Sequence, residues 1–96
     1  MQVQVQSIHF DADRKLINFI EEKLQKLTHF HDRITFSEVF LRLDKSDVNE
    51  NKIAEIKLSI PGKDLFARKQ CRTFEEATDV AVEALRRQID KMKTKK

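Results

Sequence analysis

The sequence is short of the residues that mark several classes of protein. Its 96 residues include one cysteine, one glycine and one proline, with no tryptophan or tyrosine. A lone Cys71 cannot form an internal disulfide, and a single glycine cannot build a glycine-rich phosphate loop. No apolar run approaches the roughly 20 residues of a membrane span, and the amino terminus lacks the basic and apolar regions of a secretory signal. We therefore expect a cytoplasmic, globular protein with few irregular loops and no membrane partner.

Positive charge is concentrated near the carboxyl terminus. Residues 86–96 hold six of the 19 basic residues and one acid, Asp90. The remaining 13 basic and 15 acidic residues give residues 1–85 a net charge of −2. Residues 86–93 also continue an apolar helical pattern that starts near Phe74, so this charge should lie on an ordered surface. One-sided positive charge on a small domain points first to a polyanion, usually a nucleic acid.

Hydrophobic periodicity predicts alternating strands and amphipathic helices. The expected strands are residues 2–8, 34–43, 52–60 and 65–70, and the expected helices are residues 15–27 and 74–92. Asp11 is the expected cap of the first helix, and Thr73 with Glu76 forms a capping box for the second. Pro61 and Gly62 supply the turn of a hairpin.

The order β-α-β-β-β-α favours an α+β fold, a two-layer sandwich in which both helices cover one face of a four-stranded sheet. The helical crossover makes the first two strands parallel, and short loops make the later strands antiparallel. Alternation directs Val39, Leu41 and Leu43 toward the helices and leaves Phe40 and Phe66 on the open face. The fourth strand, short and charged, would be a protected edge. We expect one domain over residues 1–93 and a basic tail over residues 94–96.

Several segments together resemble the ribosome hibernation-promoting factors, also called ribosome-associated inhibitor A proteins. They are KLQKL at 23–27, FHDRI at 30–34, IPGKDLFA at 60–67 and LRRQIDKMK at 85–93. The predicted topology is also that of the family. Where many members have Asp-Met-Tyr at the start of the last helix, this chain has Thr73-Phe74-Glu75, so no contact of that tyrosine is carried over.

The resemblance implies a protein that binds ribosomal RNA of the small ribosomal subunit, between head and body. There it would block the paths of messenger and transfer RNA and silence ribosomes in stationary phase or stress. Residues 1–93 would be the ribosome-binding domain. The implied RNA-binding residues are Lys23, Lys26, Arg87, Lys91 and Lys93, with Arg86 at a position where the family varies. Long members pair ribosomes through a further C-terminal domain, so we do not expect this chain, which ends at Lys96, to do so by itself.

Other interpretations of these residues stay open. Lysines near helix ends are often a solvated face that the helix dipole favours, and the two basic helix ends converge only if the helices run parallel. Phe40 and Phe66 could stack on bases, pack against arginine and lysine stems, or form a weak self-association patch. The alternative function is a protein-interaction module that modulates an alternative sigma factor, since the family often carries that label. It would use the open sheet face or the acidic face of the second helix.

The remaining reactive side chains do not form a catalytic constellation. His29 and His31 lack further ligands for a metal site, so His31 is expected to support its turn or touch phosphate. Cys71 lies near Lys69 and Arg72, which would make its thiol somewhat acidic. We expect no enzyme activity, no metal, no cofactor and no small-molecule substrate.

Overall fold

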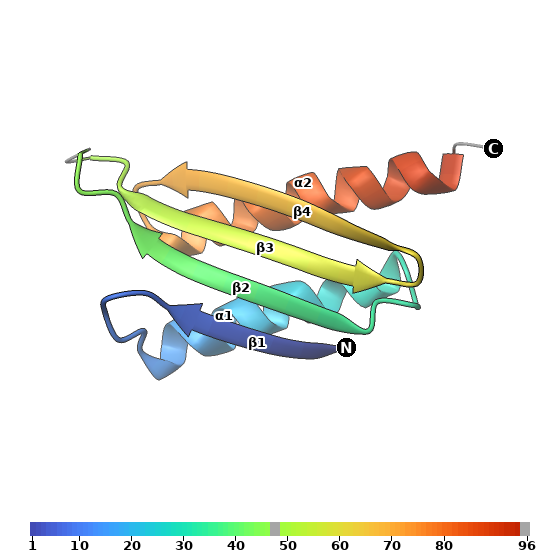
Figure 1. Ribbon diagram of the computed structural model, residues 1–96, viewed down its shortest axis with the longest axis horizontal. Coiled ribbons are helices and arrows are strands. Elements are labelled where there is room, and N and C mark those ends of the chain that lie inside the picture. Colours follow the sequence, from blue (N-terminus) through green and yellow to red (C-terminus); the bar gives the residue numbers. More distant parts are fainter. Residues whose placement is uncertain (47–48, 95–96) are drawn as a thin grey trace.

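A computed structural model describes residues 1–46 and 49–94. The elements follow the predicted β-α-β-β-β-α order, with a short 3-10 helix after the first helix (Figure 1). They are β1 (Gln2–Ser7), α1 (Arg14–Gln25), η1 (Lys26–His29), β2 (Phe36–Leu43), β3 (Lys52–Ile60), β4 (Lys63–Cys71) and α2 (Phe74–Thr94). Thr94, the first residue of the expected 94–96 tail, belongs to α2, and the rest of that tail lies outside the described residues. None of the helices in the described ranges has the length and apolar character needed to cross a membrane.

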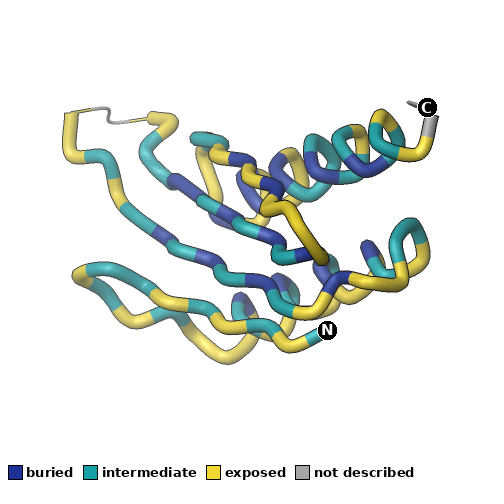
Figure 2. The backbone as a smooth tube through the Cα atoms, turned by 45° about the vertical axis from the view of Figure 1, so that its right-hand side comes forward, coloured by how far each residue is buried: buried dark blue, intermediate teal, exposed yellow. Residues whose placement is uncertain are grey.

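The four strands form one sheet in the order β1-β2-β3-β4, which confirms the predicted fold class. β1 and β2 are parallel, and the pairs β2–β3 and β3–β4 are antiparallel. The register aligns Val5 with Val39, Val39 with Ile56, and Ile56 with Ala67. Because strand side chains alternate between faces, this apolar row lies on one side of the sheet. Figure 2 shows the resulting alternation of buried and less buried residues along the strands.

Both helices pack on the same face of the sheet, where their apolar stripes close the core. α1 contributes Ile20 and Leu24, and α2 contributes Leu85 and Ile89, all with no exposed surface. Burial of each such side chain stabilises the fold by about 1.5–3 kcal/mol. The opposite face of the sheet has no covering layer in the described part of the chain (Figure 1).

The two helices run parallel, and the sheet topology explains why. β1 and β2 point the same way, β3 reverses, and β4 reverses again, so β1 and β4 run in the same direction. Each of these two strands is followed by a helix that returns across the sheet. α1 and α2 therefore both end at the same end of the molecule, as Figure 1 shows. This resolves the orientation that the sequence left open.

Two local predictions are wrong. The cap of α1 is Asp13 rather than Asp11, since an Asp13 carboxylate oxygen accepts a hydrogen bond from the Leu16 backbone N–H at 2.8 Å. β4 is not a short strand over residues 65–70, because β3 pairs with it along its whole length, from the Ile60–Lys63 pair beside the turn to the Lys52–Cys71 pair. Part of its outer edge is instead occupied by Gln88 of α2, whose amide donates to the Phe66 carbonyl at 2.9 Å.

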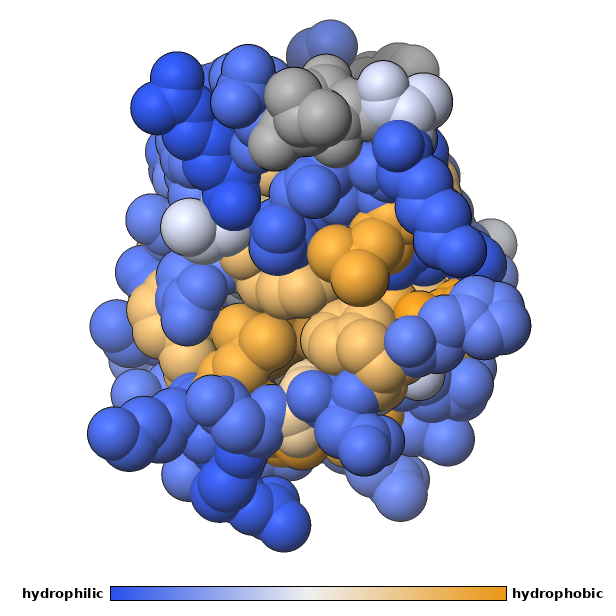
Figure 3. All heavy atoms as spheres, turned by 90° about the vertical axis from the view of Figure 1, so that its left-hand side faces the viewer, coloured by the Kyte–Doolittle hydropathy of each residue, from blue (hydrophilic) through white to orange (hydrophobic). Residues whose placement is uncertain are grey.

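Leu43 is also misplaced by strand alternation. Val39 and Leu41 are fully buried as expected, but Leu43 is 42% exposed. It is the last residue of β2 and borders a surface hollow with Ile8 and His9. β1 and β2 end, and α1 and α2 begin, at this end of the molecule (Figure 1). Figure 3 shows apolar side chains gathered on the surface there. The core thus stops short of the tip of β2.

Candidate nucleic-acid interface

The parallel helices bring the exit turn of α1 and the last turns of α2 to one end of the molecule (Figures 1 and 2). A hollow of about 490 Å³ lies between them. His31 and Arg33 line it from the exit turn, and Lys93 lines it from α2. Segments sixty residues apart in sequence therefore share one basic surface. The sequence predicted this convergence only if the two helices run parallel.

The predicted basic residues of α2 divide between two flanks of that helix. At 100° per residue, Arg86 and Lys93 lie on one side of the axis, while Arg87 and Lys91 lie on the other. The Arg86 guanidinium lies 5.6 Å from the Phe30 ring centroid, which fixes the first flank beside α1 and η1. The structure thus separates the predicted α2 residues into an α1-side pair and a β4-side pair.

The β4-side flank includes two lysines that the sequence analysis missed. Arg87 and Lys69 line one shallow hollow, and Lys91 and Lys63 line another. Lys63 and Lys69 occupy the same alternate positions of β4 as the buried Leu65 and Ala67, so their side chains start from the helix-covered face. That alternation was readable in the sequence for Lys69, which lies in the predicted strand over residues 65–70, but not for Lys63, which precedes it.

Lys23 is already engaged within the protein. Its ammonium lies 2.8 Å from an Asp79 carboxylate oxygen and 5.6 Å from the Phe19 ring centroid. The ion pair links α1 to α2, and the Lys23 side chain is only 31% exposed. Lys23 can reach a phosphate only by giving up part of this arrangement.

Arg86 is the most strongly held of the predicted cations. It donates to Glu83 at 2.6 Å and to Asp90 at 2.9 Å while covering the Phe30 ring. The hydrogen bond from Arg86 is the main cause that lowers the pKa of Glu83, and the same bond raises the pKa of Arg86. With two carboxylates around it, Arg86 fastens α2 to the exit turn of α1 and offers little free charge.

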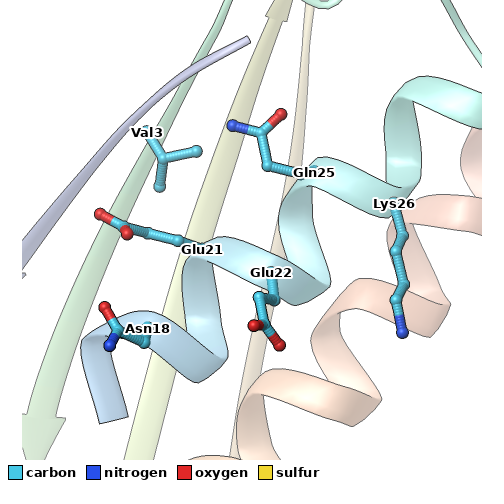
Figure 4. Close-up of a pocket in the computed structure, with 6 residues that line it drawn as sticks. All are labelled: Val3, Asn18, Glu21, Glu22, Gln25 and Lys26. Atoms are coloured by element: carbon cyan, nitrogen blue, oxygen red, sulfur yellow. The ribbon is translucent and has the colours of Figure 1, made fainter. Parts of the chain in front are cut away.

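The other predicted cations are more accessible. The Arg87 side chain is 75% exposed, and its Nε lies 3.7 Å from a Glu83 carboxylate oxygen, which is a loose contact. Within residues 1–46 and 49–94, Lys26 and Lys93 are exposed and form no ion pair. Figure 4 shows Lys26 pointing away from Val3 of β1, on the opposite side of α1 from Gln25. Free positive charge is therefore located at the ends of the helices.

A hollow of about 580 Å³ between α1 and β1 does not suit a phosphate (Figure 4). Its rim carries two carboxylates, Glu21 and Glu22, against one lysine, Lys26. Gln25 is already engaged there, because its amide donates to the Met1 carbonyl at 2.9 Å. The part of this hollow formed by Glu21 and Glu22 is therefore not part of the candidate interface, and Lys26 lies at its border.

The open sheet face carries cations that are matched by carboxylates. Arg42 and Arg68 each place Nε 3.2 Å from a Glu55 oxygen, and Lys57 lies 3.8 Å from Glu38. The Arg42 guanidinium also lies 5.9 Å from the centroid of the Phe40 ring. This contact favours the interpretation that Phe40 packs against an arginine side chain. Phe66 remains 54% exposed.

The reactive side chains near the turns have structural surroundings. His31 Nδ1 accepts a hydrogen bond from the Arg33 backbone N–H at 3.1 Å, so His31 supports its turn as expected. The described residues contain no group of three or more His, Cys, Asp or Glu side chains suited to a metal. The expectation of an acidic thiol is wrong: burial, with Glu76 and Glu50, raises the pKa of Cys71 more than Lys69 lowers it.

Two solved structures share this fold. A ribosomal subunit interface protein from Coxiella burnetii superposes with a TM-score of 0.88 at 22% identity, covering 99% of this chain and 100% of that one. The N-terminal domain of Thermus thermophilus Protein Y gives a TM-score of 0.82 at 22% identity, covering 96% and 99%.

The chain belongs to the family described as Sigma 54 modulation protein / S30EA ribosomal protein, which matches residues 3–96. It is 30% identical over 95 residues to ribosome hibernation promoting factors of Pseudomonas putida and Azotobacter vinelandii, covering 99% of this chain and 89% and 85% of those proteins. A Deinococcus radiodurans ribosome hibernation promotion factor is 30% identical over 97 residues, and this chain spans 51% of its length. The family resemblance seen in the sequence is thereby confirmed.

Proposed function

We propose that this protein binds the small ribosomal subunit through ribosomal RNA and silences ribosomes by covering the paths of messenger and transfer RNA. The action is steric exclusion with electrostatic capture, so no bond is made or broken and no cofactor is needed. Residues 1–93 act as the ribosome-binding domain, and the protein works in the cytoplasm. Its relatives named as ribosome hibernation promoting factors support this proposal.

The observation that carries the proposal is the convergence of the two helix ends. Parallel helices place Lys26 and the basic exit turn of α1 at the same end as Lys93 of α2. Arg87 and Lys91 add a second line of charge on the β4 side. Folded RNA is bound mainly by shape and phosphate contacts, for which two such lines of lysine and arginine on rigid helices are suited.

The alternative function is protein interaction through the open sheet face. Phe66, which is 54% exposed, favours it, and the family description includes sigma-54 modulation. The cations of that face are matched by Glu38 and Glu55, so a partner there would be recognised by Phe66 and hydrogen bonding more than by charge.

Co-sedimentation with isolated small subunits across a salt series tests the proposal. Wild type should bind stoichiometrically and release as salt rises, because phosphate contacts displace counterions. The variant Arg87→Glu, Lys91→Glu should stay in the supernatant. Its matched control is Lys45→Glu, Arg72→Glu, which makes the same charge change at the opposite end of the molecule and should still bind.

Melting curves of both variants separate lost binding from lost folding. If folded wild type remains in the supernatant even at low salt, ribosome binding is wrong for this chain. If both double variants bind like wild type, the helix ends are not the anchor, and the sheet face becomes the surface to test with Phe66→Ala.

A further inference from the structure

The hollow between η1 and the last turns of α2 brings together polar and charged side chains from two segments far apart in the sequence. Its lining includes His31, Asp32 and Arg33 from the exit turn and Lys93 from α2, with the Phe30 ring as an apolar wall. Of these, Lys93 was expected to bind RNA, and His31 was expected to support its turn or touch phosphate. The two segments that line it lie at the end of the molecule where both helices end (Figure 1).

We infer that this hollow binds one phosphodiester group of an RNA strand, held by Arg33, Lys93 and the Nε2–H of His31. The inference rests on the proposed function and names a contact within it. Arg33 and Lys93 are exposed and, in the described part of the chain, form no ion pair. A guanidinium can meet two phosphate oxygens at once, and a lysine ammonium adds a point charge.

The turn sets the tautomer of His31. Its Nδ1 accepts the Arg33 backbone N–H at 3.1 Å, so Nδ1 carries no hydrogen. The proton of the neutral ring is therefore on Nε2, which becomes a donor on the other side of the imidazole. One backbone bond thus prepares His31 to donate to an anion while it also holds the turn that presents Arg33.

The charges of the hollow suit a single phosphodiester. Arg33 and Lys93 against Asp32 leave one net positive charge when the histidines are neutral. A phosphodiester carries one negative charge. Arg86 lies next to the hollow, but its charge is taken up by Glu83 and Asp90. Its role is to hold Phe30, and with it the exit turn, beside α2.

NMR titration of the full chain with a short single-stranded oligoribonucleotide tests the site without ribosomes. The His31 ring, the Arg33 side chain and the Lys93 ammonium should shift together and saturate together. A parallel titration with inorganic phosphate separates the two sources of the anion. Shifts with inorganic phosphate alone, and none with the oligonucleotide, would overturn the RNA assignment.

Affinity measurements across salt provide the second readout. Arg33→Ala, Lys93→Ala should weaken oligonucleotide binding about fivefold near 0.15 M salt and lower the salt slope by about one, the value for one phosphate contact. The control Lys45→Ala, Arg72→Ala removes the same charges at the opposite end and should keep the wild-type slope. Equal slopes for the two double variants would overturn the inference.

His31→Asn separates the role of His31 as an Nε2–H donor from its role in holding the turn. Asparagine can still accept the Arg33 N–H through its side-chain oxygen, as in an Asx turn, but it lacks Nε2. Binding should fall about threefold with an unchanged melting temperature, and wild-type affinity in this variant would exclude His31 as a ligand. If wild type binds the oligonucleotide at this hollow but does not co-sediment with small subunits, the phosphate site stands and the ribosomal proposal fails.

Discussion

The open sheet face and the helix ends both carry lysines and arginines, but the two regions use them differently. On the sheet face, Arg42, Lys57 and Arg68 each lie within 4.0 Å of a carboxylate, because the register sets Glu38 opposite Lys57 and Glu55 opposite Arg68. At the helix ends, Lys26 and Lys93 have no such partner in the described residues. The same residue types are therefore paired with carboxylates on the sheet face and available to a ligand at the helix ends.

The strongest test of this difference removes two cations from each region. Lys26→Gln, Lys93→Gln should weaken binding to small subunits by up to about 25-fold near 0.15 M salt, since the phosphate contact of Lys26 is lost and the one that Lys93 shares with Arg33 is weakened. Lys57→Gln, Arg68→Gln should change it less than twofold. Equilibrium binding of both variants to small subunits measures this, and equal losses would show that the sheet face contributes as much as the helix ends.

Glu55→Gln should leave unpaired positive charge on the sheet face, as there is at the helix ends. The change leaves Arg42 and Arg68 without the carboxylate that both now contact. We expect nonspecific affinity for single-stranded RNA to rise about fivefold at low salt, while stability falls by about 1 kcal/mol or less. Fluorescence anisotropy and chemical denaturation give the two values. An unchanged RNA affinity would mean that shape, not charge matching, keeps RNA from the sheet.

Asp79→Asn makes the corresponding change within the helical layer. It releases Lys23 from its ion pair and should raise RNA affinity about twofold. Stability should change by about 0.5 kcal/mol or less, because the pair is partly exposed. The same anisotropy assay applies, with Asp79→Asn, Lys23→Gln as the control that should cancel the gain. A gain that survives in the double variant would assign it to the lost acid alone.

The smallest effect concerns acid stability around Arg86. The pKa of Glu83 is lowered in the folded protein, chiefly by the hydrogen bond from Arg86, so this group stabilises the fold above its ordinary pKa. That contribution is lost as pH falls through the lowered pKa. The difference in melting temperature between wild type and Glu83→Gln should therefore be present at pH 7 and shrink in acid. Arg86→Gln should show the same trend, and a constant difference down to about pH 3 would contradict the linkage.

Local physical chemistry predicted most elements of the fold. Alternation placed β3 at its observed bounds, and Thr73 caps α2 as expected, since its hydroxyl accepts the Glu76 N–H at 3.0 Å. One error was local, since Asp13 rather than Asp11 caps α1, and two others came where a neighbouring element decided the outcome. β4 is longer than its own apolar pattern because β3 supplies hydrogen bonds along its full length, and Leu43 is exposed because the core ends before the tip of β2.

The sequence by itself determined the class of fold, the family and the presence of basic helix ends, because periodicity, turn residues and charge clusters are local properties. Only the tertiary structure decided which cations are available. It made the helices parallel, placed Lys93 beside Arg33, and paired Lys23 with Asp79. These outcomes depend on distances between segments far apart in the chain. Such distances are fixed by sheet order and helix packing, which no local pattern encodes.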